Sequence, residues 1–315
     1  MRCYAMPEKR VQLAAIAAFV ALCIIWSSTW LAIKLGLRDL PPVSFVAIRF
    51  VIAVAVLLAI SIGRVPLLPR NQGDFKFLAA TGVLMFCVNY VLLFWAELYV
   101  SSGLSAVLQA TIPIFGMVFA HYIIPGEPLR GSRILGAIVA TGGVAVICSR
   151  LLDFGGVLAF WGGVAIVLGA AGAAYSNVLL KAREIKMAPA MIAAWQMIFG
   201  LIPLVVGGLI IDGNPIHFQW TGRAVFCLLY LAIPGSAIAF LLLYWLLPRM
   251  SVTNLQTISF ITPPGAVGFG WLLGGETFTL WSLCGGALVL VGVWLIFRKA
   301  KEAELEECET ALPQG

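Results

Sequence analysis

The chain has 315 residues, of which 62% are hydrophobic and only 11% are charged, and its mean hydropathy is +1.02. A soluble globular domain is typically about 45–50% apolar and about 25% charged. This composition excludes a surface that is mostly exposed to water, so we expect an all-α, polytopic membrane protein without a separate soluble domain.

The first apolar run, from Val11 to about Ile33, follows Arg2, Lys9 and Arg10 and could therefore imitate a signal peptide. It is longer than the roughly 7–15 residues of a signal-peptide core, and no small-residue cleavage site ends it. We expect it to be the first of ten transmembrane helices, because each span needs roughly 20 apolar residues. The ten apolar runs are 11–34, 42–62, 75–98, 102–124, 132–150, 155–180, 189–211, 223–247, 252–273 and 278–297.

Lysine and arginine predict the orientation, because they are enriched in cytoplasmic loops. With the N-terminus in the cytoplasm, fifteen of the twenty cations fall in cytoplasmic segments and four in outer segments, and Arg49 lies within a span. The pattern predicts a multi-pass protein of the plasma (inner) membrane with both termini in the cytoplasm.

The second half of the chain repeats features of the first half at a nearly constant spacing. The matched pairs are Lys34 with Lys181, Pro42 with Pro189, Arg49 with Gln196, Trp95 with Trp245, Pro113 with Pro263, Glu127 with Glu276, Gly136 with Gly285 and Gly143 with Gly292. We predict two repeats of five spans, 12–150 and 155–298, followed by a cytoplasmic tail, 299–315. An odd number of spans inverts the second repeat, and inverted repeats are characteristic of secondary transporters.

These residues resemble the EamA branch of the drug/metabolite transporter superfamily. The resemblance is carried by Ile25–Trp30 with Lys34, by Leu40-Pro41-Pro42, by Arg49-Phe50, by the turn Gly126–Leu129 with Gly136 and Gly143, and by Gly275-Glu276-Thr277 with Gly285 and Gly292. It implies ten spans, a central cavity between two bundles, and export of metabolites, amino acids or toxic amphiphiles. It implies no particular substrate.

Two ionisable residues interrupt the apolar runs. Arg49 lies well inside the second run and Glu97 lies near the outer end of the third. Intramembrane charges are expensive and are functional candidates, although Arg49 could also be structural and bond helix carbonyls. Glu97 could pair with Arg49, could carry a coupling proton, or could simply lie at the interface.

Further polar and aromatic residues lie within the spans and could contact a substrate. The predicted substrate-binding residues are Arg49, Tyr90, Trp95, Gln109, Tyr175, Asn177, Gln196, Tyr244, Trp245 and Gln256. Each could instead pack against lipid or bond across helices. Pro113 and Pro263 predict matching helix breaks beside the cavity, because a broken helix exposes backbone groups that lipid cannot satisfy.

An enzyme is poorly supported, because the sequence has no HExxH pair, no phosphate-binding loop and no GxSxG elbow. A channel would need a ring of charge or a carbonyl filter, which one Arg and one Glu do not supply.

We predict a secondary transporter that exports a small metabolite, amino acid or toxic amphiphile by alternating access. The alternative is a facilitator, exchanger or channel-like pore without proton coupling. We expect a small-molecule substrate and the lipid bilayer as partners, with no nucleic acid, no cofactor and no metal; the sequence leaves the substrate, the direction of flux and the oligomeric state open.

Overall fold

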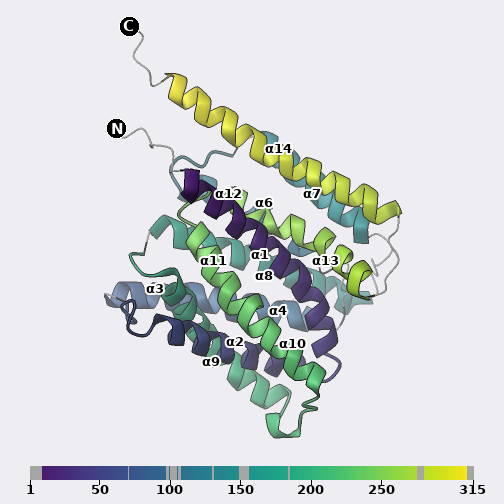
Figure 1. Ribbon diagram of the computed structural model, residues 1–315. Coiled ribbons are helices and arrows are strands. Elements are labelled where there is room, and N and C mark those ends of the chain that lie inside the picture. Colours follow the sequence, from purple (N-terminus) through teal and green to yellow (C-terminus); the bar gives the residue numbers. More distant parts are fainter. Residues whose placement is uncertain are drawn as a thin grey trace.

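The computed structural model describes residues 9–69, 71–96, 99, 105, 108–129, 131–148, 156–183, 185–274 and 280–310 (Figure 1). Within these ranges the chain is helical and contains no strand. The α-helices are α1 (Lys9–Gly36), α2 (Pro42–Ser61), α3 (Gln72–Gly82), α4 (Asn89–Ala96), α6 (Ile112–Ile123), α7 (Gly131–Cys148), α8 (Gly156–Arg183), α9 (Pro189–Ile211), α10 (Gly222–Ala232), α11 (Ala239–Leu246), α12 (Val252–Gln256), α13 (Ile258–Gly274) and α14 (Leu280–Thr310). Two π-helical turns, η1 (Val83–Val88) and η3 (Ile233–Ile238), join α3 to α4 and α10 to α11, and a short 3₁₀ turn, η2, spans Pro215–His217.

The molecule is a multi-pass membrane protein. Six helical segments of the described chain are long and apolar enough to cross a bilayer, namely Val11–Ile33, Pro42–Ser61, Gln72–Leu93, Gly156–Arg183, Pro189–Ile211 and Gly222–Leu246. Shorter apolar helices cover Ile112–Ile123, Gly131–Val146 and Leu283–Ile296. Large apolar side chains such as Leu13, Ile210 and Phe226 are more than two-thirds exposed. Helices satisfy their own backbone groups, and lipid accommodates these outward apolar faces.

The helix pattern of the first half recurs in the second half. α1 and α8 have 28 residues each, and both bounds differ by 147 positions. The two π-helical turns have six residues each and differ by 150 positions. A π-helix is rare, so its presence at equivalent places shows that the two-repeat layout extends to local backbone geometry.

The two halves exchange their first helices in space. α8 packs against α4 and α6, and α9 packs against α3 and η1; we call this group, with α3, η1, α4, α6, α8 and α9, bundle A. α1 packs against α10, α11 and α13, and α2 packs against α10 and η3; we call the group of α1, α2, α10, η3, α11, α12 and α13 bundle B. The long contact of α2 with α9 joins the bundles.

The remaining helices, α7 and α14, lie side by side at one edge of the molecule (Figure 1). Their contact depends on glycine. A Cβ on Gly136 would lie 2.7 Å from the carbonyl oxygen of Gly292, and a Cβ on Gly143 would lie 2.7 Å from that of Gly285. The contacts run in opposite directions along the two helices, so α7 and α14 are antiparallel.

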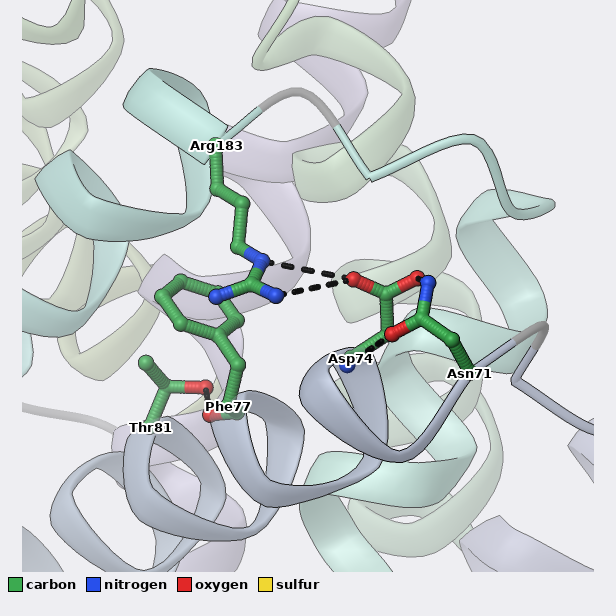
Figure 2. Close-up of polar contacts among 5 residues, drawn as sticks. All are labelled: Asn71, Asp74, Phe77, Thr81 and Arg183. Carbon is green, nitrogen blue, oxygen red and sulfur yellow. Dashed lines mark hydrogen bonds and ion pairs between the residues drawn. The ribbon is translucent and has the colours of Figure 1, made fainter.

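An ion pair connects two helix ends within each bundle. In bundle A, Arg183 at the end of α8 donates to Asp74 at the start of α3 from Nη2 at 3.2 Å (Figure 2). The guanidinium of Arg183 also lies 4.7 Å from the ring centroid of Phe77. In bundle B, Asp39 beyond α1 accepts from Arg223 at the start of α10 at 2.7 Å. The two ion pairs occupy equivalent ends of the repeats, with the positions of acid and base exchanged. We call the end of the molecule that contains Arg183 and its neighbour Lys181, both in the last turn of α8, the Lys181 end. The opposite end, which contains Asp39, is the Asp39 end.

Candidate substrate-binding cavity

A cavity of about 180 Å³ lies between bundles A and B. Bundle A contributes side chains from η1, α4, α6 and α8, and bundle B contributes side chains from α1, α2, α11, α12 and α13. The lining is mostly apolar and aromatic, with one charged residue among the described ones. The lining residues are Trp26, Thr29, Trp30, Ile33, Arg49, Met85, Asn89, Tyr90, Leu93, Gln109, Ile112, Ala173, Asn177, Phe240, Leu243, Leu247, Val252, Leu255, Gln256, Ile258, Ser259, Thr262 and Pro263.

Arg49 projects from α2 and is 4% exposed. Its Nε donates to Oγ of Ser236 at 2.6 Å, and its Nη2 donates to the carbonyl oxygen of Gly235 at 3.2 Å. Its guanidinium carbon lies 5.6 Å from the ring centroid of Phe50 and 6.0 Å from that of Tyr90. Neutral dipoles and aromatic faces therefore surround the charge. A guanidinium has five N–H donors, and these two bonds use only part of that capacity.

The π-helical turn η3 supplies both acceptors of Arg49. The hydroxyl of Ser236 donates a hydrogen bond to the carbonyl oxygen of Leu231 at 2.9 Å, which directs the hydroxyl lone pairs toward Arg49. The carbonyl oxygen of Gly235 also accepts from Nε1 of Trp26 at 3.3 Å. A Cβ on Gly235 would lie 2.9 Å from Cγ2 of Thr29, so α1 approaches this turn more closely than a larger residue would allow.

The equivalent position in the second repeat is neutral and closed. Gln196 on α9 is fully buried, and its Nε2 donates to Oγ1 of Thr81 at 2.7 Å. The carbonyl oxygen of Thr81 accepts from Ser176 Oγ at 3.0 Å. Gln196 does not line the cavity. The two repeats therefore differ at this pair of positions: Arg49 places a cation beside the cavity, and Gln196 does not.

Aromatic rings form a wall next to Arg49. The Tyr90 ring packs edge-on against Phe50 with centroids 5.1 Å apart, and the Trp26 ring packs edge-on against Phe240 at 5.6 Å. The amide side chains of Asn89, Asn177, Gln109 and Gln256 also line the cavity. This combination of one cation, several amides and aromatic faces can bind a solute that has an anionic group and an apolar body.

A known protein family matches both halves of the chain. The family model of the EamA-like transporter family matches residues 13–149 and again residues 160–298. The chain belongs to the EamA-like transporter family.

Relatives within this family are described as transporters. The chain is 26% identical over 277 residues to the uncharacterized transporter YoaV of Bacillus subtilis, covering 88% of the chain and 94% of that protein. It is 30% identical over 293 residues to a probable terminal-alkyne amino-acid exporter of Streptantibioticus cattleyicolor, covering 90% and 94%. It is 29% identical over 274 residues to the inner membrane transporter YedA of Escherichia coli, covering 86% of each chain. The expected EamA resemblance is thus confirmed, and the chain is a membrane transporter.

A solved crystal structure shares the fold. It superposes with a TM-score of 0.79, covers 92% of this chain and 99% of its own, and is 18% identical in sequence. At this identity the likeness concerns the fold alone.

The structure divides the predicted binding residues of this EamA protein into two groups. Arg49, Tyr90, Gln109, Asn177 and Gln256 line the cavity. The others lie elsewhere: Trp95 is 39% exposed beside Tyr99, Tyr175 is 39% exposed beside Phe119, Gln196 bonds Thr81, Tyr244 is buried beside Phe240, and Trp245 lies under Arg249. Binding by the first group stays a prediction.

The two prolines are placed differently from each other. Pro113 is buried in the first turn of α6. Pro263 lines the cavity but lies inside α13, which continues through Pro263 and Pro264. The interruption in that span lies earlier, at Thr257 between α12 and α13. A helix in a membrane tolerates proline where neighbouring groups satisfy the freed carbonyl.

Glu97 lies outside the described residues, so its pairing with Arg49 stays a prediction. Sequence reasoning missed Gly235 and Ser236 as the partners of Arg49. Their only signal is the Pro234-Gly235-Ser236 sequence within an apolar run, where small and polar residues mark a local departure from regular helix.

Proposed function

We propose that this EamA-family protein is a secondary exporter of a small carboxylate-bearing metabolite, such as an amino acid, and that it works by alternating access. The observation that carries the proposal is Arg49, a buried guanidinium that faces the inter-bundle cavity with donors to spare. Arginine recognises a carboxylate through paired hydrogen bonds. The aromatic wall beside it would hold an apolar side chain.

The size of the cavity favours a small solute over a bulky amphiphile. Its volume of about 180 Å³ is below the roughly 300–1,000 Å³ of pockets that hold drug-sized ligands. A relative named as a probable amino-acid exporter supports the same class of substrate.

The proposed arrangement in the membrane has ten spans in two inverted five-helix repeats, with the Lys181 end in the cytoplasm. The antiparallel contact of the equivalent helices α7 and α14 supports the inversion. The distribution of lysine and arginine supports the orientation, and a relative named as an inner membrane transporter supports the location.

The test is a comparison of metabolites in the medium and in cell extracts, made for cells that produce the protein, cells that lack it, and cells that produce Arg49→Met. We expect one or more small carboxylates to accumulate outside only with the unchanged protein. A conservative variant, Arg49→Lys, should export less than the unchanged protein, because lysine cannot form the planar fork of arginine. Export restricted to cationic or neutral amphiphiles would overturn the substrate class. Repeating the efflux measurement after collapse of the proton gradient separates proton-coupled export from facilitation or exchange.

A further inference from the structure

A second polar cluster lies at the Lys181 end, outside the cavity. Glu127 follows α6 and is 9% exposed, and Lys181 occupies the last turn of α8. Lys181 Nζ lies 2.8 Å from Glu127 Oε1. Gly126 precedes Glu127 with a φ of +85°, a conformation that favours glycine, and Glu127 lies in the turn that follows the end of α6 at Ile123.

The ion pair belongs to bundle A, but both of its members form hydrogen bonds with the backbone of bundle B. Lys181 Nζ donates to the carbonyl oxygen of Met250 at 2.5 Å, and the backbone N–H of Val252 donates to Glu127 Oε1 at 3.1 Å. Met250 lies in the connection from α11 to α12, and Val252 is the first residue of α12. The cation meets an acceptor and the anion meets a donor, so the pair matches the polarity of this connection.

These hydrogen bonds lie next to the cavity, at its Lys181 end. Val252 both donates to Glu127 and lines the cavity, and Leu255 one turn later lines it as well. Opening the cavity toward the Lys181 end requires α12 of bundle B to move away from α6 and α8 of bundle A. That movement breaks the contacts of Met250 and Val252 with the ion pair.

The same junction contains an amide side chain without hydrogen-bond partners in the described part of the chain. Gln256 on α12 packs against Gly116 on α6, where a Cβ would lie within 1.4 Å of Oε1 of Gln256. Both amide atoms of Gln256 are buried without a hydrogen-bond partner in the described part of the chain. Oε2 of Glu127 is likewise buried without a partner there. An unsatisfied buried polar atom costs stability, so the junction is less tightly held than a fully bonded one.

We propose that Lys181 and Glu127 form a reversible clasp at the cytoplasmic end of the cavity. The clasp closes this end when its contacts with Met250 and Val252 are formed, and it opens to admit the substrate from the cytoplasm. This role rests on the proposed alternating access and assigns the two residues to the transport cycle rather than to substrate binding. A merely structural ion pair would stabilise the protein without controlling access to the cavity.

Access can be measured without knowing the substrate. Ser259 lines the cavity, and Ser259→Cys is a nearly isosteric reporter. The probe is a membrane-impermeant methanethiosulfonate reagent, applied to inverted membrane vesicles, which expose the cytoplasmic face. The chain without the Ser259→Cys change gives the background from its own seven cysteines.

We expect Lys181→Met and Glu127→Gln each to accelerate modification of the reporter from the cytoplasmic face by about tenfold or more. The matched control is Arg183→Gln, which breaks a neighbouring ion pair that lies wholly within bundle A (Figure 2) and should leave the rate unchanged. The exchange Lys181→Glu with Glu127→Lys should not restore slow modification, because it reverses the polarity that the backbone of Met250 and Val252 requires.

Unchanged modification rates in folded Lys181→Met and Glu127→Gln would overturn the clasp. If the charge exchange restored slow modification of the reporter, the ion pair would not act through the backbone of Met250 and Val252. If Lys181→Met does not give monodisperse protein, Lys181→Arg carries the test, since it keeps the charge but changes the geometry and should give an intermediate rate. The labelling needs no substrate, so its outcome is independent of whether the carboxylate export is found.

Discussion

Arg49 of α2 donates from Nε to Oγ of Ser236 at 2.6 Å, and this bond connects the first repeat to the π-helical turn of the second. Both residues belong to bundle B. The charge beside the cavity is thus held by an element with which it would move as one body. Arg49 can present its remaining donors to the cavity without losing its support.

Removing the hydroxyl of Ser236 should loosen Arg49. We expect Ser236→Ala to lower stability by about 1–3 kcal/mol, because a buried charged donor loses its acceptor, and to reduce export more than it reduces folded yield. Thermal unfolding in detergent and efflux from cells measure the two effects. Ser176→Ala is the control: it loses a bond between neutral groups, for which about 0.6 kcal/mol is the average in membrane helices. Equal effects of the two changes on export would contradict a special role for Ser236.

The contact between α7 and α14 makes a test with neighbouring residues possible. A Cβ on Gly143 would lie 2.7 Å from two backbone atoms of α14, whereas a Cβ on Gly142 would meet nothing within 4 Å. We expect Gly143→Ala to destabilise the protein by about 1–3 kcal/mol through overpacking. Gly142→Ala should be neutral or stabilising, because alanine favours helix over glycine by about 1 kcal/mol. Melting temperatures in detergent decide it, and indistinguishable values would show that the helices do not pack as described.

Asp39 gives a pH prediction outside the spans. Hydrogen bonds from Arg223, and then from Thr221, lower the pKa of Asp39 below its ordinary value. The ionised form is therefore favoured by folding, and its contribution is complete above the unfolded pKa of about 3.9 and is lost as the pH falls through the lower folded value. We expect Asp39→Asn to lower the melting temperature equally at pH 5 and pH 8. A difference that grows between these two values would contradict this assignment.

The orientation predicts that reporters fused to either end of the chain report from the cytoplasm. The physical reason is the excess of lysine and arginine in the segments assigned to that side. A fluorescent protein that folds only in the cytoplasm and a phosphatase active only outside it form a complementary pair. Phosphatase activity at either terminus would refute the topology.

Much of the architecture could be predicted from the sequence, because hydropathy and repeated marker residues depend on the local chain. The matched pair Pro42 and Pro189 identified the equivalent starts of α2 and α9. The position of Arg49 within an apolar run was enough to make it a candidate. The exchange of α1 and α8 between bundles leaves no such mark, since it depends on contacts between distant segments.

The site was harder to predict. Tyr175 and Trp95 face outward, whereas Asn177 and Tyr90 line the cavity, and these helices are apolar on all sides, so periodicity does not separate the faces. The π-helical turn that aims Gly235 at Arg49 is a change in hydrogen-bond register, which composition does not reveal.

The exchange of first helices between bundles has a consequence in time. α1 is made first, but its partner α13 begins about 220 residues later. At roughly 5–20 residues per second of synthesis, α1 waits in the bilayer for roughly 10 to 45 s before α13 exists. During that interval α1 exposes a face that only α13 can cover, so a ribosome that stalls near residue 250 would leave a membrane-inserted fragment that lacks α12, α13 and α14.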